Sequence, residues 1–278
     1  MALTSRQVEN LNDLIYQALG LAFDDSKADF IQKRVEKRMA QLGMTRADDY
    51  VFHLRFLDAG GKEMQALANL VTTNETYMFR EFDQLQAFAD CCLPEILLAS
   101  EKRGRKALRV WSAGCSSGEE PYTLAIILRE VIHDIDTWDV QILATDIDEV
   151  RLEMARKATY GLRSVKEVPE AYVERHIVEL DADTYVVSPQ TTRLVEIRHL
   201  NLHDRIAMRS VRGMDFIFCR NVLIYFDDAS RKDVVDRFFH ALAPGGYLFL
   251  GHAESVGRIS SAFALKRFGK HLVYRREP

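Results

Sequence analysis

The loop between residues 110 and 122 constrains the fold of this chain more than any other segment. An apolar run from Leu108 to Trp111 leads into it, glycines stand at Gly114 and Gly118, and an apolar stretch with helical spacing follows. A strand, a glycine-containing turn and a helix start in this order are typical of the ligand-binding edge of a parallel sheet. The loop therefore predicts an α/β protein that binds a small molecule.

Two patterns of hydrophobicity divide the chain. The first eighty residues show helical spacing, as in the stripe Ile31, Val35, Met39 and Leu42, which Gly43 follows. From residue 107 onward, short apolar runs alternate with amphipathic helices, which predicts a mostly parallel sheet covered by helices. We expect a helical N-terminal domain (1–81), a connecting helix and linker (82–106) and an α/β domain (107–278).

The alternation is interrupted between about residues 161 and 198. The pattern there predicts a short helix at 169–176 and two strands, 184–187 and 194–200, which we interpret as a small antiparallel β insertion. Elsewhere the apolar runs predict strands at 107–113, 140–146, 214–220, 246–252 and 271–275, with Pro244-Gly245-Gly246 ending the helix before the fourth of them.

Charge and cysteine content argue against several classes of protein. The formal net charge of −4 gives no reason to expect nucleic-acid binding. No stretch approaches the ~20 apolar residues that span a bilayer, and a signal peptide is not evident, so direct membrane insertion is not expected. The cysteines Cys91, Cys92, Cys115 and Cys219 form no C-x-x-C pair, so we expect neither a metal site nor disulfides, and a reduced, cytoplasmic setting.

The acidic residues of the loop predict a cationic ligand. Residues Ser117 to Glu120 match a capping box, and Pro121 suits a first helical turn, so helix initiation explains part of the pattern. The G-x-G-x-x-G pattern is absent, and glutamates at a helix start would repel a pyrophosphate but attract an ammonium group. We interpret Glu119 as a ligand for such a group, with capping alone as the alternative.

Asp146 closes the second expected strand. An acidic residue at this place in a nucleotide fold accepts hydrogen bonds from ribose hydroxyls. Asp148 is better placed to cap the following helix, which leaves Asp146 for a ligand. A ribose and a cationic amino-acid tail without phosphate describe S-adenosylmethionine. The sequence therefore predicts a class I S-adenosylmethionine-dependent methyltransferase, Rossmann-like in fold.

Five motifs in order carry a more specific resemblance. The motifs are Asn-Glu-Thr-Tyr-Met-Phe-Arg at 74–80, Trp-Ser-Ala-Gly-Cys-Ser-Ser-Gly-Glu-Glu-Pro-Tyr at 111–122, Ala-Thr-Asp-Ile-Asp at 144–148, Cys-Arg-Asn-Val-Leu-Ile-Tyr-Phe at 219–226 and Gly-His-Ala-Glu-Ser at 251–255. With them the chain resembles the bacterial chemotaxis receptor methyltransferase family (CheR) over essentially its whole length. Met78 departs from the family, which more often has an aromatic residue there.

The resemblance implies an activity and a set of site residues. The activity is methylation of glutamate side chains on chemoreceptors, which gives methyl esters. Arg80 and Tyr225 would lie closest to the methyl group and the acceptor carboxylate. The implied cofactor residues are Asn74, Thr76 and Arg80 from the small domain, Gly114 of the loop, Glu119 and Asp146 for the amino-acid tail and ribose, Asn201 and Leu202 near the adenine, and Arg220 and Asn221.

The expected chemistry needs no general base. A glutamate has a pKa near ~4.3, so it is already ionised at neutral pH and can attack a sulfonium methyl directly. The chain offers no convincing Ser/His/Asp or Cys/His constellation, which agrees with this. We interpret His199, His203 and His252 as packed or hydrogen-bonded histidines.

Two expectations concern the partner. Lys33, Arg34, Lys37 and Arg38 lie on one expected helix, and we interpret them as a docking face for acidic receptor helices, with a solvated surface as the alternative. In some family members the insertion docks a receptor tail peptide by adding a strand to its sheet. The insertion here lacks their glycine-rich loop, so we expect no tail requirement.

Other functions remain open at this stage. The chain could methylate another substrate, or bind S-adenosylmethionine as a regulatory module without catalysis. A nicotinamide-dependent oxidoreductase is disfavoured because the phosphate-binding loop is missing.

Overall fold

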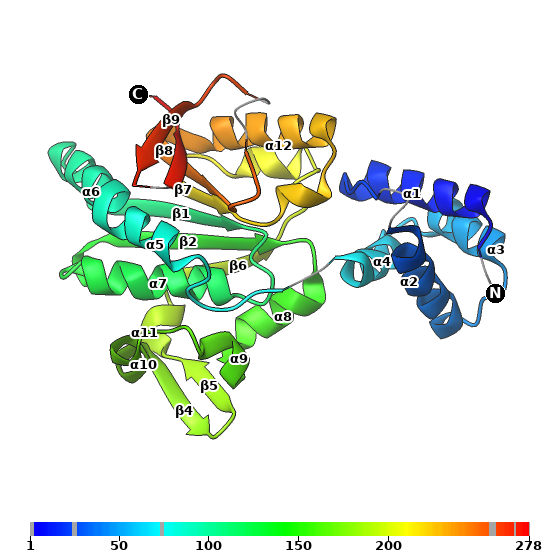
Figure 1. The fold of residues 1–278 in the computed structure, drawn as a ribbon, viewed down its shortest axis with the longest axis horizontal. Helices are drawn as coiled ribbons and strands as arrows, with labels where there is room; N and C mark the ends of the chain where they lie inside the picture. The colour runs from blue at the N-terminus through cyan, green and yellow to red at the C-terminus, as the bar shows by residue number, and fades with distance from the viewer. Residues whose placement is uncertain (1–2, 24–26, 73–74, 256–259, 270, 278) are drawn as a thin grey trace.

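A helical domain and an α/β domain lie side by side along the longest axis of the computed structural model (Figure 1). The structure describes residues 3–23, 27–72, 75–255, 260–269 and 271–277. A smaller unit with its own antiparallel strands projects from the α/β domain. In the part of the chain described, no helix is both long and apolar enough to cross a bilayer.

The helical domain is built around buried apolar stripes. Its first helix is capped by Thr4, whose side chain accepts a hydrogen bond from the Gln7 amide, while the Gln7 side chain accepts one from the Thr4 amide. The predicted stripe on the second helix is buried, except that Leu42 is exposed because the helix ends one residue earlier. The helices are α1 (Ser5–Leu19), α2 (Ala28–Gln41), α3 (Ala47–Phe52) with a π-helical turn at His53–Leu57, and α4 (Lys62–Val71).

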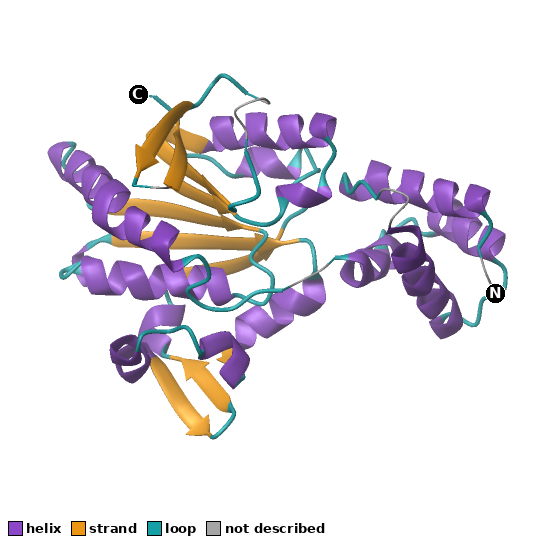
Figure 2. Cartoon of the chain, in the orientation of Figure 1, coloured by secondary structure: helices purple, strands orange, loops and turns teal. Residues whose placement is uncertain are grey.

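The α/β domain is organised on a seven-stranded sheet with the order β6-β2-β1-β7-β8-β10-β9 (Figure 2). Neighbours from β6 to β8 run parallel, and β10 and β9 add an antiparallel hairpin at one edge. The strands are β1 (Ala107–Ala113), β2 (Asp139–Asp146), β6 (Val195–His199), β7 (Met214–Cys219), β8 (Leu242–Leu250), β9 (Ala264–Phe268) and β10 (His271–Arg275).

Helices cover both faces of this sheet. On one face Phe88 packs edge-on against Phe216 and Phe218, with ring centroids 4.9 and 5.2 Å apart. On the other, Trp111 meets Phe238 of α12 at 5.3 Å. The helices are α5 (Phe82–Ala87) with a π-helical turn at Phe88–Cys92, α6 (Leu93–Lys102), α7 (Glu119–Val131), α8 (Glu149–Lys157), α12 (Asp228–Ala241) and 3-10 turns at Ile135–Thr137, Ala207–Ser210 and Leu223–Tyr225.

Two details of the predicted fold are wrong. Residues 194–200 are not part of the insertion: β6 pairs in parallel with β2 and forms an edge of the main sheet. The helix α12 ends at Ala241, and Pro244-Gly245-Gly246 lies inside β8. The inserted unit instead contains β3 (Thr159–Tyr160), α9 (Leu162–Val165), α10 (Glu170–His176), β4 (Ile177–Asp181), β5 (Thr184–Val187) and α11 (Pro189–Thr192), with the sheet order β3-β5-β4.

Candidate active site

A cavity opens at the carboxyl ends of the strands, where the strand order reverses between β1 and β7. This switch point is where doubly wound α/β folds bind their ligands. Residues from both domains line the cavity. The predicted site residues among them are Thr76, Arg80, Gly114, Asp146, Asn201, Leu202, Arg220, Asn221 and Tyr225. Of the remaining predicted cofactor residues, Asn74 lies outside the described residues, and Glu119 lines a neighbouring hollow.

The loop after β1 is shaped by its glycines. Gly114 and Gly118 have φ values of +91° and +96°, a region that favours glycine. A Cβ atom on Gly114 would lie 2.3 Å from Cγ2 of Val222, and one on Gly118 would lie 2.7 Å from the hydroxyl of Tyr160. The space beside these two glycines is therefore filled by side chains of the protein itself.

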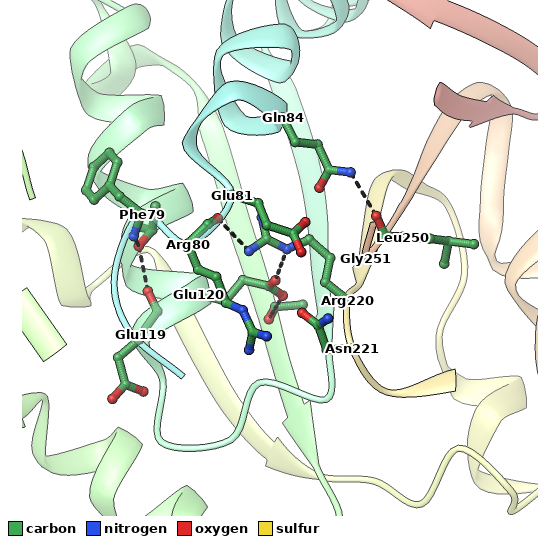
Figure 3. Close-up of polar contacts among 12 residues, drawn as sticks. Phe79, Arg80, Glu81, Gln84, Glu119, Glu120, Arg220, Asn221, Leu250 and Gly251 are labelled. Atoms are coloured by element: carbon green, nitrogen blue, oxygen red, sulfur yellow. Dashed lines mark hydrogen bonds and ion pairs between the residues drawn. The ribbon is translucent and has the colours of Figure 1, made fainter. Parts of the chain in front are cut away.

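The predicted capping box at Ser117 is not formed. Helix α7 is capped by Gly118 without a side-chain hydrogen bond, and the Ser117 hydroxyl donates to Oε2 of Glu119 at 2.8 Å. The hydroxyl of Ser164 donates to Oε1 of Glu119 at 2.9 Å. Glu119 is buried, and Figure 3 shows its carboxylate pointing away from Arg80 and Arg220.

The next residue, Glu120, lines the cavity instead. Its carboxylate accepts a hydrogen bond of 2.7 Å from Ser112 and lies 3.0 Å from Nε of Arg220. Burial raises the pKa of Glu120, and the Arg220 charge opposes that shift. Nη2 of Arg220 donates to the carbonyl of Arg80 at 2.7 Å, so one guanidinium joins both sides of the cavity (Figure 3). In the sequence, the only sign of this role is that Glu120 is the second of two adjacent glutamates in the loop.

Asp146 stands at the end of β2 and lines the cavity, with its side chain fixed by backbone donors. The amides of Ser116 and Asp148 donate to its two oxygens at 2.7 and 2.9 Å. Burial raises the pKa of Asp146. Asp148 accepts from the Arg151 amide at 3.1 Å and caps α8, which confirms the predicted cap. Each Asp146 oxygen keeps acceptor capacity for a ligand hydroxyl.

Glu254, for which the sequence predicted no role, holds in place the segment that follows β7. Its carboxylate accepts hydrogen bonds from the amides of Asn221 (2.8 Å) and Gly251 (2.7 Å). This joins two of the motifs that carried the resemblance. Sequence spacing could not reveal the contact, because thirty-three positions separate Asn221 from Glu254.

Backbone strain is concentrated near the cavity. Phe79, Glu81, Ser116 and Asn221 all have φ values between +48° and +61°, although none is glycine. Such conformations persist only where the surroundings hold them, and they cluster at functional sites. Ser116 and Asn221 line the cavity, and Phe79 and Glu81 flank Arg80, which also lines it.

The helical domain supplies part of the cavity wall. Leu19 and Leu21 line it, and Leu21 forms an isolated antiparallel bridge with Phe226. The amide of Ala22 donates to the Tyr225 carbonyl at 2.9 Å. The side-chain amide of Asn201 donates to the carbonyl of Ala18 at 2.8 Å. The cavity is therefore complete only when both domains are in place.

The four basic residues of the predicted docking face on α2 have two different environments. Arg38 forms an ion pair of 2.7 Å with the buried Glu63, and that contact raises the pKa of Arg38. Nε of Arg34 donates to the carbonyl of Leu70 at 3.3 Å. Lys33 and Lys37 remain exposed. Two of the four basic residues thus serve contacts within the helical domain.

The residues of the cavity fit S-adenosylmethionine. Two carboxylates, on Glu120 and Asp146, suit an ammonium group and ribose hydroxyls, and Leu19, Leu21 and Leu202 offer an apolar wall. Among the described residues, three buried polar atoms of the cavity lining have no hydrogen-bond partner: Oγ of Ser116 and Nε and Nη1 of Arg220, of which Nε lies 3.0 Å from the Glu120 carboxylate. Within the described ranges, no group of three or more His, Cys, Asp or Glu side chains could hold a metal ion.

A doubly wound sheet with an antiparallel edge hairpin and an acidic residue at the end of its second strand is the arrangement of a class I S-adenosylmethionine-dependent methyltransferase. Comparison with known families agrees. The chain belongs to the CheR methyltransferase family: the family's SAM-binding domain matches residues 74–269 and its all-alpha domain matches residues 6–72. The predicted family, fold class, cofactor and enzyme class are thereby confirmed.

Relatives match over most of their length. The chain is 39% identical to chemotaxis protein methyltransferase 2 of Vibrio cholerae, over 99% of this chain and 94% of that protein. It is 34% identical to the chemotaxis protein methyltransferase of Salmonella typhimurium (96% and 89% covered) and 32% identical to that of Escherichia coli (96% and 90% covered). The enzyme is therefore an S-adenosylmethionine-dependent methyltransferase of chemotaxis.

Proposed function

We propose that this enzyme transfers the methyl group of S-adenosylmethionine to glutamate carboxylates of chemoreceptors and forms methyl esters. One observation carries the proposal: Arg80 and Tyr225 line the same cavity as the two cofactor carboxylates, so an anionic acceptor can meet the methyl group there. The names of the chemotaxis relatives support a receptor as the acceptor.

The cofactor is oriented by the charged walls of the cavity. Asp146 accepts hydrogen bonds from the ribose hydroxyls, and Glu120 binds the ammonium group. Nη1 of Arg220 and the hydroxyl of Ser116, which have no hydrogen-bond partner in the part of the chain described, would donate to the tail carboxylate. Asn201, which lines the cavity where the helical domain closes it, would lie beside the adenine.

The neighbouring Glu119 has a different role. Its two carboxylate oxygens already accept hydrogen bonds from Ser117 and Ser164, and its side chain lines the adjacent hollow. We therefore assign the cationic tail to Glu120 and a supporting role to Glu119.

When bound, S-adenosylmethionine supplies a methyl group made electrophilic by its sulfonium. The ionised acceptor carboxylate forms the new O–C bond while the C–S bond breaks and its electron pair stays on sulfur. No proton moves, so no base is needed. Arg80 orients the anion and the Tyr225 hydroxyl donates to one of its oxygens, which holds the reacting atoms in line. Opposite charges disappear in this step, so a cavity with little water favours it.

Receptor docking uses the exposed lysines of α2. Lys33 and Lys37 present positive charge, which would attract the acidic helices of a receptor in a salt-dependent manner.

The inserted unit leaves the receptor tail dispensable. Strands β4 and β5 are joined by a tight turn at Ala182 and Asp183 that contains no glycine. The turn therefore lacks the glycine-rich loop of the tail-binding members, so we propose methylation without a tail peptide.

Transfer of labelled methyl to receptor-containing membranes tests the function. We expect label on the receptor that is released as methanol by mild alkali, because carboxyl esters are base-labile. Base-stable label would show nitrogen methylation and another substrate class. Tight cofactor binding without any transfer would favour a regulatory module. Receptors lacking their C-terminal tails should be methylated at a similar rate, and a loss of methylation would contradict tail independence.

A further inference from the structure

The segment that carries Arg80 has an irregular backbone. This segment, residues 75–81, is called the arm here; it leads into α5 and contains no helix or strand. Phe79 and Glu81, on either side of Arg80, have left-handed φ values of +59° and +58°. Because such a backbone conformation persists only where surrounding contacts hold it, the orientation of the Arg80 side chain depends on the contacts that the arm makes.

The inserted unit makes several of these contacts. The Met78 amide donates to the carbonyl of Ser164, in α9, at 2.8 Å. The Phe79 ring lies against Tyr172 of α10, with centroids 5.8 Å apart. The Phe79 amide donates to the Thr123 hydroxyl of α7 at 3.0 Å. Met78 and Phe79 are both buried at this junction.

Ser164 is itself fastened to the start of α7. Its hydroxyl donates to Glu119 at 2.9 Å, and Glu119 is only 3% exposed. The Thr123 hydroxyl that receives the Phe79 amide donates to the Glu119 carbonyl at 2.7 Å. The arm, α9 and the start of α7 therefore form one closed set of hydrogen bonds around Glu119 (Figure 3 shows Glu119 beside Phe79).

We propose that Ser164 is a positioning residue for methyl transfer. Its hydroxyl fixes α9 to Glu119, and its carbonyl then holds Met78, which sets the direction of Arg80 two residues later. The inserted unit is thus a support of the catalytic arm. The inference rests on the proposed function only in that Arg80 acts on the acceptor carboxylate.

The variants Ser164→Ala and Ser164→Thr test the proposal. Alanine removes the hydroxyl, and we expect kcat to fall by about tenfold or more, because small misplacements of a catalytic group are costly. The dissociation constant for S-adenosylmethionine should stay within about threefold, since Glu120, Asp146 and Arg220, which we assign to the cofactor, are untouched. Threonine keeps the hydroxyl and should restore kcat. Leu162→Ala, a change on the same helix at a side chain that is 53% exposed, is the matched control and should be silent.

Hydrogen exchange gives a readout that needs neither cofactor nor receptor. Peptides covering residues 75–82 should exchange faster in Ser164→Ala than in the wild type, while peptides of β1 and β2 stay protected. If Ser164→Ala does not fold, Tyr172→Leu tests the same support through the Phe79 contact and should show the same split between kcat and cofactor affinity.

The outcomes separate this inference from the proposed function. Unchanged kcat and unchanged exchange in Ser164→Ala would overturn the positioning role, as would a threonine variant as impaired as alanine. If the wild type methylates no receptor glutamate, the proposed function fails, whereas the exchange experiment still decides whether Ser164 holds the arm.

Discussion

A shift of one position along α7 decides which acid of the loop meets the cofactor cavity. Glu119 and Glu120 are adjacent, and the sequence favoured the first. Successive helical residues point about 100° apart, so only one of the two can face the cavity. Glu120 lines the cavity beside Arg220, whereas Glu119 is enclosed by serine hydroxyls.

Substitution by glutamine distinguishes the two acids. Glu120→Gln should weaken S-adenosylmethionine binding by about tenfold or more, because a hydrogen bond between charged groups contributes roughly 1.5–3 kcal/mol. Glu119→Gln should leave the affinity within about threefold of the wild type. Isothermal titration calorimetry measures both. The assignment is wrong if Glu119→Gln is the variant that loses affinity.

At the scale of elements, the parts predicted well were those with strong local patterns. The spans of β1, β2 and β10 follow from apolar runs bounded by polar residues, and Asp148 marks the start of α8. The sequence predicts the wrong sheet for the edge strand β6, because an apolar run does not say which strand it pairs with. Pro244-Gly245-Gly246 predicts a helix stop, but the parallel pairing of β7 with β8 accommodates these residues in a strand with a register shift.

The same limit applies to the predicted docking face on α2. Helical spacing predicts that the four basic residues lie together, but it cannot show that Arg38 forms an ion pair with a buried glutamate on another helix. Glu63 also accepts a hydrogen bond from the Tyr50 hydroxyl at 2.8 Å, so Arg38 neutralises a carboxylate that is almost fully buried.

Charge reversal on α2 should therefore have two different results. Lys33→Glu with Lys37→Glu should raise the KM for receptor at low salt and leave the melting temperature unchanged, since both side chains are exposed. Arg38→Ala should lower the free energy of unfolding by about 3 kcal/mol, because it leaves Glu63 buried without its partner. Kinetics at two salt concentrations and urea unfolding measure these effects. A double lysine variant with normal KM at low salt would contradict the docking role.

At the scale of the whole molecule, the cavity proposed for catalysis is formed at the junction of the domains. The helical domain contributes Leu19 and Leu21 to the cofactor cavity and holds the loop of Tyr225 through the Ala22 amide. Arg80, in the arm that links the two domains, also lines this cavity. The inserted unit, which lies below α7 in Figure 1, contacts the arm through the hydrogen bond between Met78 and Ser164. The sequence motifs identify most of the residues that line this cavity, but their arrangement in space depends on packing between segments that are far apart in the sequence.

The central claim is that Arg80 and Tyr225 act on the acceptor carboxylate inside this shared cavity. The most direct measurement is the rate of receptor methylation by Arg80→Ala and Tyr225→Phe, with S-adenosylmethionine affinity measured in parallel. We predict that each variant loses about tenfold to a hundredfold in kcat, and that Tyr225→Phe keeps its cofactor affinity within about threefold. Near-normal turnover in both variants with unchanged cofactor affinity would contradict the account.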